Sequence, residues 1–489
     1  MSVRLVNWVI VICYFAMTLW IGRRVGRDQA GLDDYLLAGR RIPWWAASLS
    51  IVATETSTLT FVGVPGIAYA GDLAFVQVAI GYVFGRAVVA VLLVPGYFQG
   101  KISTAYEVLA VRFGGRVQTL ASVVFMVNRW LADGVRLFAT ALVLLALMPM
   151  PLPVAIALVA GITLYYTLRG GLRAVIWNDV IQQFIYLGGA LVAAVILLWR
   201  MPGGWQGALQ VLEPQGKLIW LNFSWDFSIP YTFWGGLIGG AVLTAATHGT
   251  DQMFVQRLLA TGSLRQGRKA LLASGLIVFA QMAFFLWIGA LLFAFYTYFP
   301  PETPFATGDA VFPRFIADEL PMGLGGLVIA AVFAAAMSTL SSSLNSLAST
   351  STIDIYQRFY RGGAGLTESE AFRVSRWLTA LWAVALSLIA FMAQAWGPVL
   401  QAGLTITSIT FGGVLGIFIV GQTSWRLSQD RAAVALAMGI VTLVIVNSLG
   451  GLAWTWYTAL GATVTVFTAG LLSLIPGPSE AVVNPDRRV

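Results

Sequence analysis

The stretch AAAMSTLSSSLNSLASTSTIDIY at positions 334–356 decides the fold class of this chain. It overlaps an apolar run near 323–352, which is long enough to cross a bilayer because a spanning helix needs about 20 residues. Ten of the fifteen residues from Ser338 to Thr352 nevertheless carry hydroxyls. Membrane helices use a few hydroxyls to bond back to their own carbonyls or to hold neighbouring helices. Ten exceed that need, and several neutral oxygens in one place are what a hard monovalent cation prefers.

The rest of the chain is similarly apolar. Of its 489 residues, 58% are hydrophobic and only 10% are charged, whereas an average soluble domain has about 25% charged residues. We predict an all-α, multi-pass membrane protein in which residues 1–489 form a single transmembrane domain with about thirteen spans. The spans are expected near residues 5–22, 43–70, 74–98, 118–148, 151–168, 174–199, 232–254, 270–297, 323–352, 372–394, 397–424, 431–449 and 451–475.

The scarcity of Cys and His excludes several kinds of site. The chain has one Cys, Cys13, and one His, His248, so neither a disulfide framework nor a transition-metal site of Cys and His can form within one chain. The sequence also lacks the GxSxG nucleophile motif and the GxxxxGK[ST] phosphate loop. We therefore predict no enzyme, no catalytic residues, no cofactor and no ATP-driven pump.

The basic residues favour one orientation in the membrane. Of the 29 Lys and Arg residues, 22 fall in segments on one side of the predicted spans, four on the other side and three inside spans. The four are Arg4, Arg200, Lys217 and Arg314, and the three are Arg86, Arg129 and Arg136. Because cytoplasmic loops carry the excess of Lys and Arg, we expect the N-terminus outside and a cytoplasmic tail at 476–489, in the plasma (inner) membrane. The net charge of +8 then reflects this bias and not a surface for nucleic acid.

Three acids lie within predicted spans, where a charge costs about 2.5 to 3.5 kcal/mol on insertion scales and usually marks a pathway. Asp133 lies four residues after Arg129 and three before Arg136, which allows pairing along its own helix. Asp179 and Glu55 have no basic residue within four positions. Each is therefore either a protonated, hydrogen-bonded structural residue or a carboxylate held ready for a cation. Glu55 could also titrate, or accept hydrogen bonds from a solute.

Two predicted spans contain polar interruptions in comparable places. Glu55 lies among five hydroxyl residues between Thr54 and Thr60, and residues His248 to Asp251 interrupt a second span about 190 residues later. Interrupted helices in corresponding positions of two halves are typical of inverted-repeat transporters with a site near the bilayer midplane. For the lone His248, a buried structural role is an equal alternative.

Four motifs resemble the sodium/solute symporter family, which includes sodium/glucose, sodium/proline and sodium/sialic acid cotransporters. They are WWAASLSIVATETSTLTFVGVPG at 44–66, YYTLRGGLRAVIWNDVIQQ at 165–183, HGTDQMFVQRLLA at 248–260 and the stretch at 334–356. The resemblance implies a LeuT-like fold, in which one extra N-terminal helix precedes two inverted five-helix repeats. Its parts would be the extra helix at 5–22, repeats at 43–200 and 232–424, and two C-terminal helices at 431–475.

The resemblance also implies the sites. A first sodium site would use carbonyls of the first repeat helix with a carbonyl and two hydroxyls of the eighth. Its residues are Ala53, Thr56, Ala335, Ser338 and Thr339. A second sodium site, found in some members, would use Asp179, Ser338, Ser341 and Ser342. The residues expected to face the substrate are Thr54, Glu55, Thr58, Thr60, Thr244, Thr247, His248 and Gln401. A Glu at position 55 replaces the Asn of sugar carriers, so the resemblance assigns no sugar.

The function implied is sodium-coupled symport of a small polar organic solute into the cell by alternating access, with lipid around a protein that works as a monomer. A proton-coupled carrier of the same fold, using Glu55 or Asp179, is the nearest alternative. A non-transporting sensor or channel is a further one, although paired helix breaks favour an occluded site over a continuous pore.

Overall fold

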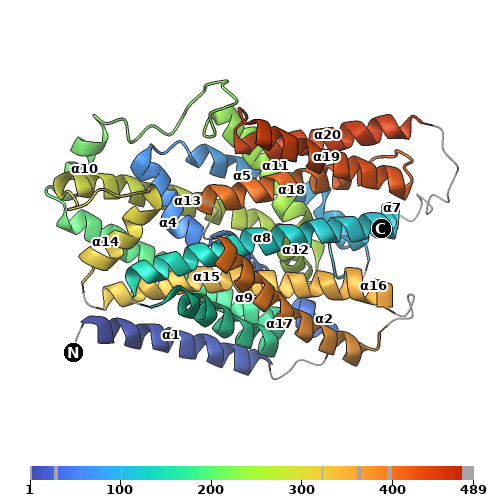
Figure 1. The fold of residues 1–489 in the computed structure, drawn as a ribbon, viewed down its shortest axis with the longest axis horizontal. Coiled ribbons are helices and arrows are strands. Elements are labelled where there is room, and N and C mark those ends of the chain that lie inside the picture. Colours follow the sequence, from blue (N-terminus) through green and yellow to red (C-terminus); the bar gives the residue numbers. More distant parts are fainter. Residues whose placement is uncertain are drawn as a thin grey trace.

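The computed structural model describes residues 3–26, 31–100, 102–148, 150–321, 323–360, 366–393 and 399–475, and the predicted tail at 476–489 lies outside these ranges. Within them the chain is all-helical and has no strand, as predicted. The long helices run along the long axis of the molecule (Figure 1). Among the described residues, seven helices are long and apolar enough to cross a bilayer, or eight if one bent pair counts as a span.

The helices up to the middle of the chain are α1 (Val3–Val25), α2 (Leu32–Leu37), η2 (Ala38–Arg40), α3 (Trp44–Glu55), α4 (Thr58–Ala70), α5 (Val76–Leu92), α6 (Val94–Tyr97), α7 (Glu107–Phe113), α8 (Gly115–Leu147), α9 (Leu152–Arg200) and α10 (Gly204–Leu212). They are followed by η3 (Gly235–Gly239), α11 (Gly240–Thr250), α12 (Gln252–Leu259), α13 (Leu264–Tyr298), η4 (Gly308–Ala310), α14 (Val311–Glu319), α15 (Leu324–Thr350), η5 (Ser351–Tyr356), α16 (Gln357–Phe359), α17 (Glu368–Met392), α18 (Val399–Gly421), α19 (Gln429–Leu449), η8 (Trp454–Trp456) and α20 (Tyr457–Ser473).

Helix α9 covers two of the predicted spans, 151–168 and 174–199. Its backbone is non-helical at Gly171, where φ is 51° and ψ is −154°. Only Gly reaches this conformation at low cost. The helix is therefore kinked between the two predicted spans, at the Gly-Gly pair that separates them in the sequence.

Both predicted polar interruptions break a helix. Helix α3 ends at Glu55 and α4 begins at Thr58, and the two helix axes differ by 62°. Hydroxyl residues here compete for backbone hydrogen bonds, which weakens a helix. The second break lies at Asp251 (φ −87°, ψ 123°), whose side chain caps α12 by accepting from the Met253 N–H.

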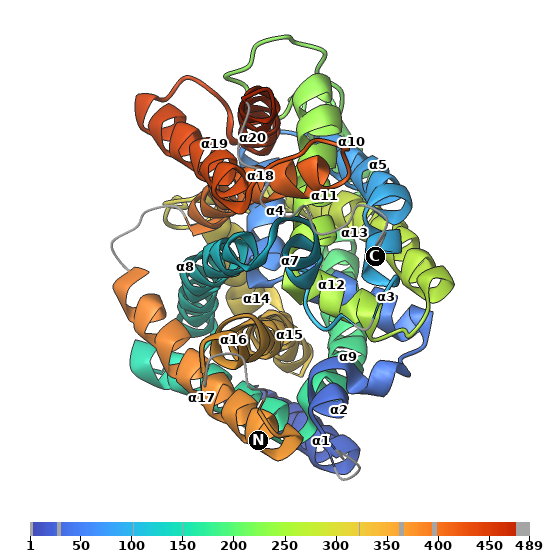
Figure 2. The ribbon, with the colours of Figure 1, turned by 90° about the vertical axis from the view of Figure 1, so that its right-hand side faces the viewer.

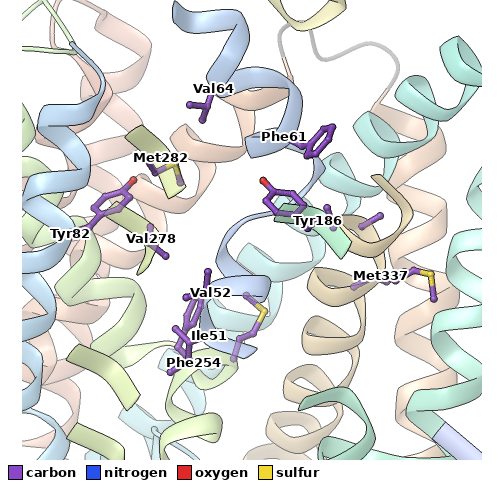
Figure 3. Packing of buried hydrophobic residues seen from close by; sticks show 14 of the residues in the cluster. Ile51, Val52, Phe61, Val64, Tyr82, Tyr186, Phe254, Val278, Met282 and Met337 are labelled. Carbon is purple, nitrogen blue, oxygen red and sulfur yellow. The ribbon is translucent and has the colours of Figure 1, made fainter. Parts of the chain in front are cut away.

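Helix α15 runs through the interior of the bundle and packs against α1, α8, α9 and α17 (Figure 2). Around the first break, Ile51 and Val52 of α3 and Phe61 and Val64 of α4 point into the core (Figure 3). The Phe61 ring packs 5.2 Å from the Tyr186 ring of α9, measured between centroids. The two short arms of the broken span are therefore anchored by buried apolar contacts.

Helices α5 and α11 cross at very short range. A Cβ atom at Gly81 would overlap the backbone of Gly236 in η3, which leads directly into α11, and one at Gly85 would overlap the backbone of Ala241 in α11. Small residues permit this close approach between membrane helices. It places Arg86 of α5 next to His248, near the end of α11.

Candidate ion and substrate sites

The first predicted sodium set lies where α15 crosses the break in α3. The Ser338 hydroxyl is 2.8 Å from the Ala53 carbonyl oxygen and 3.1 Å from the Ala335 carbonyl oxygen. The Thr339 hydroxyl is 3.1 Å from the Thr54 carbonyl oxygen and 3.4 Å from that of Ala335. All of these residues are buried. The structure therefore brings neutral oxygens from both helices together at one point.

The break explains why these carbonyls are available. The last four carbonyls of a helix have no partner within it, and α3 ends at Glu55. Thr56 closes the final turn, because its N–H (2.9 Å) and its hydroxyl (2.6 Å) both bond to the Val52 carbonyl. The Ala53 and Thr54 carbonyls are left to bond α15. Thr56 itself lies at the break with its side chain turned back onto α3.

The second predicted set contains a charge partner that the sequence did not indicate. The Oδ2 atom of Asp179 accepts from Arg257 Nη2 (3.1 Å) and from the Ser50 hydroxyl (2.5 Å). Both charged side chains are fully buried. No basic residue lies within four positions of Asp179 in the sequence, and the folded protein supplies one from α12, 78 residues further along the chain. Arg257, counted among the 22 basic loop residues, lies on the short helix α12 and points into the bundle.

The predicted serines of α15 divide between two roles. Ser342 accepts from Arg257 Nη2, and its oxygen lies 2.9 Å from the Thr54 hydroxyl. Both serines also donate to the Ser338 carbonyl of their own helix, Ser341 at 3.1 Å and Ser342 at 2.6 Å. The structure thus brings Ser342 into the Asp179 network and shows no hydrogen bond from Ser341 to it.

Arg257 uses most of its donors within this network. Its Nε donates to the Ser50 hydroxyl (2.7 Å) and its Nη1 to the Met253 carbonyl (2.6 Å). The Oδ1 atom of Asp179 is buried and has no hydrogen-bond partner among the described residues. The carboxylate of Asp179 therefore has one oxygen without a partner, although the guanidinium of Arg257 already neutralises its charge.

Asp133 pairs along α8 as predicted. Its Oδ1 lies 3.5 Å from Arg129 Nη1 and also accepts from Arg136, and the Ser343 hydroxyl of α15 donates to Oδ2. Arg129 also pairs with Asp251 at the second break. Asp133 is therefore bound by Arg129, Arg136 and Ser343, and it forms part of the contact between α8 and α15.

A cavity of about 90 Å³ is lined from both broken helices. Most of the predicted substrate residues line it, namely Thr54, Glu55, Thr60, Thr244, Thr247 and His248. Thr58 does not, because its hydroxyl turns towards the Val332 carbonyl of α15, 3.3 Å away. The side chain of Gln401 lies outside the described residues, although Gly403 and Thr407 of the same helix line the cavity.

Glu55 also has a partner that was not expected from the sequence. Arg86 of α5 donates to its Oε2, and His248 Nε2 lies 3.5 Å from the same oxygen. Arg86 is completely buried, while the Glu55 side chain keeps 14% of its surface exposed. Glu55 thus lines the cavity and is paired on the side that faces α5.

Sequence reasoning missed Arg86, Arg136 and Arg257 as site residues. A signal existed for Arg86, because it is a basic residue inside a span with no acid within four positions. Such a residue needs a partner from another helix, and Glu55 had the same need. Arg257 gave no such signal, since the helix break that carries it into the core made its segment resemble a loop.

Two broken helices that meet around a cavity, with carbonyls freed at the break in α3, are typical of a membrane carrier. The comparison with protein families identifies which one. The model of the sodium:solute symporter family matches residues 35–439, and the chain belongs to this family. It is a sodium-coupled solute symporter and not an enzyme, and sodium is its coupling ion.

Individual relatives agree over nearly the whole chain. The sodium/sialic acid symporter SiaT of Proteus mirabilis (strain HI4320) is 29% identical, over 98% of this chain and 97% of its own length. The human sodium-coupled monocarboxylate transporter 1 is 28% identical, over 85% of this chain and 68% of its own length. A solved structure of a Na⁺-coupled sialic acid symporter, in a substrate-bound outward-open state, superimposes with a TM-score of 0.88 at 28% identity, covering 97% of this chain and 98% of that one.

Proposed function

We propose that this protein imports a small polar organic acid together with sodium by alternating access. One observation carries the proposal: the Ser338 and Thr339 hydroxyls of α15 meet the Ala53 and Thr54 carbonyls at the break in α3. A sodium ion that replaced these hydrogen bonds would join α3 to α15 through ligands from both. Ion binding would then favour one relative arrangement of the two helices over the other.

We infer a first sodium site made of Ala53, Thr56, Ala335, Ser338 and Thr339. Support comes from its composition, since these are carbonyl and hydroxyl oxygens of the hard type that alkali and alkaline-earth cations select. We infer a second site at Asp179 with Ser338, Ser341 and Ser342. Its support is the open Oδ1 of Asp179, which only a cation or a hydrogen-bond donor can satisfy.

The solute would bind in the cavity at the two breaks, against Thr54, Glu55, Thr60, Thr244, Thr247 and His248, with Gln401 as a further proposed contact. The names of both relatives above state that they transport acids, sialic acid for one and monocarboxylates for the other. A fitting group is present, because Arg136 lines the cavity with an 18% exposed side chain. We therefore propose that Arg136 binds the acid's carboxylate.

The proposed topology has about thirteen spans, with the N-terminus outside and the C-terminus in the cytoplasm. It consists of inverted repeats at 43–200 and 232–424 after an extra helix at 5–22, then two helices at 431–475 and the tail at 476–489. One broken helix falls in each proposed repeat, which supports this division. We propose that the monomer is the working unit.

Charge movement makes the ion stoichiometry measurable. Each charge moved inward gains about 2.3 kcal/mol per 100 mV. Two sodium ions with a monovalent acid move one net charge, and a single ion moves none. Uptake by two ions would therefore rise with an inside-negative potential, whereas uptake by one ion would not.

The deciding experiment is uptake of radiolabelled sialic acid and of lactate into proteoliposomes holding the purified protein. We expect uptake of at least one of them with an inward sodium gradient, and none when choline replaces sodium at fixed pH. Uptake that persists in choline and follows a proton gradient would instead establish the proton-coupled alternative. Ion current without solute, in single-channel recording, would favour a channel.

A further inference from the structure

In the cluster of Glu55, Arg86 and His248, the geometry determines which atoms donate hydrogen bonds and which accept them. Arg86 can only donate, so His248 Nε2, which lies 3.0 Å from its Nη2, must accept. The imidazole is therefore neutral and carries its proton on Nδ1. That proton points to the Thr247 hydroxyl at 3.0 Å, and Thr247 passes its own hydrogen to the Leu243 carbonyl at 3.1 Å.

The hydrogen bonds of the cluster leave one carboxylate oxygen of Glu55 without a protein donor. Arg86 is fixed further by the Ser274 hydroxyl, 3.1 Å from its Nη1, and it bonds Glu55 through Oε2. The Oε1 atom of Glu55 has no hydrogen-bond partner among the described residues, and the side chain lines the cavity. The His248 proton is already used, and Arg86 Nε, which is buried without a hydrogen-bond partner among the described residues, makes no bond to Oε1.

We propose that Glu55 Oε1 is a selectivity contact that accepts a hydrogen bond from a hydroxyl group of the transported acid. This inference rests on the proposed function and adds to it the class of solute, a hydroxylated organic acid and not a bare one. Its basis is that Oε1 has no protein donor among the described residues and belongs to a partly exposed side chain on the cavity wall, so water is its donor until a solute hydroxyl replaces that water. A site built for a donor discriminates strongly against an analogue that lacks it.

The charge of the cluster favours a hydroxyl over an ammonium group. Arg86 already neutralises Glu55, and His248 is neutral, so the three residues carry no net charge. An ammonium bonded to Oε1 would bring a second positive charge next to the Arg86 guanidinium, whereas a hydroxyl adds none. We therefore expect hydroxy acids to be preferred to amino acids of the same size.

The test uses sodium-dependent thermal stabilisation of the purified wild-type protein by propionate, lactate and alanine, together with gluconate and sialic acid. Besides the carboxylate, propionate carries no donor, lactate one hydroxyl and alanine one ammonium, whereas gluconate and sialic acid each carry several donors. We expect at least one hydroxylated acid to bind with affinity at least tenfold above that of propionate, and alanine to bind no better than lactate. Propionate as good as the hydroxylated acids, or alanine best of all, overturns the inference alone. No sodium-dependent binding by any acid overturns the proposed solute class and the inference with it.

Two variants separate the contact from a structural role. Glu55→Gln keeps an oxygen for Arg86 and turns an amide towards the cavity, so it should weaken the hydroxy acid only severalfold. The double variant Glu55→Met with Arg86→Met removes the buried pair as a unit and should weaken the hydroxy acid at least tenfold. In both variants the hydroxy acid should lose more affinity than propionate does, and Glu55→Gln should also lower stability because it leaves the buried Arg86 guanidinium without its counter-charge. If both variants weaken all acids equally, or leave the hydroxy acid unaffected, Glu55 is only part of the packing and the inference is wrong.

Discussion

Two groups of oxygens lie one turn apart on α15 and differ in charge. Ser338 and Thr339 meet backbone carbonyls of α3, and none of the residues proposed for that site carries a charge. Ser342 meets Asp179 and Arg257, a buried pair that is neutral as a unit. No cationic side chain in the described part of the chain reaches the first group, so a cation bound there must be an ion from solution. At the second, a guanidinium on the chain already occupies one oxygen of the carboxylate.

The difference follows from the cost of burying charge. Removing one partner from a buried ion pair costs about 3 to 5 kcal/mol, whereas replacing both together is often neutral. Losing a neutral hydroxyl costs about 1 kcal/mol. Substitutions at Asp179 should therefore act first on folding, and substitutions at Ser338 and Thr339 should act first on sodium.

The largest effect is expected for Asp179→Asn, which leaves the buried Arg257 guanidinium without its counter-charge. We expect a loss of about 3 to 5 kcal/mol in stability, measured as thermal unfolding in detergent without sodium. In variant protein that folds, the Hill coefficient for sodium in uptake should fall from about two to one if the second ion binds here.

The double variant Asp179→Asn with Arg257→Gln is the control. It removes both charges, so stability should return to near that of the wild type. If its Hill coefficient stays at one, the carboxylate binds an ion. A Hill coefficient that recovers together with stability means that Asp179 serves only to neutralise Arg257, and a wild-type coefficient of one removes the second site.

The next effect is expected at the neutral group. Combining Ser338→Ala with Thr339→Ala removes two proposed ligands, each worth about 1.4 kcal/mol or tenfold in affinity. The sodium concentration for half-maximal uptake should rise about 100-fold, with little change in unfolding temperature. Ser346→Ala is the matched control, because that hydroxyl is on the same helix and bonds only to the Ser343 carbonyl. Equal sodium dependence in both would contradict the site.

A smaller effect is expected to distinguish Arg136 from Arg257, because the two arginines differ in the groups that they already bind. Arg257 is fully buried and its nitrogens are spread over four partners, whereas Arg136 bonds Asp133 and is exposed to the cavity. Arg136→Gln should raise KM for an acid about tenfold, a typical loss for a charged hydrogen bond, and leave the half-maximal sodium concentration unchanged. A changed sodium requirement with an unchanged KM would mean that Arg136 acts on the ion site.

The sequence predicted the all-helical membrane fold, both helix breaks and the pairing of Asp133, since each depends on neighbours along the chain. It failed for Glu55 and Asp179, whose counter-charges come from α5 and α12. A basic residue between apolar segments normally indicates a loop. A short helix after a break can nevertheless bring such a residue into the bundle without changing the sequence pattern around it. The direction of a hydroxyl is hidden for the same reason, as Thr58 and Thr60 look alike in sequence.

Substitutions at these two threonines are expected to have the smallest effects. They test whether a buried neutral oxygen is sufficient to form a binding site. Thr58 lies 3.3 Å from the Val332 carbonyl, nearly two turns before the first oxygen group on α15, whereas Thr60 lines the cavity. Thr58→Val should cost about 1 kcal/mol of stability and change KM for the acid and the half-maximal sodium concentration less than twofold. Thr60→Val should raise KM severalfold at an unchanged sodium requirement. If Thr58→Val instead shifts the sodium requirement as Ser338→Ala does, the ion draws on α4 as well, and the neutral group extends past the break.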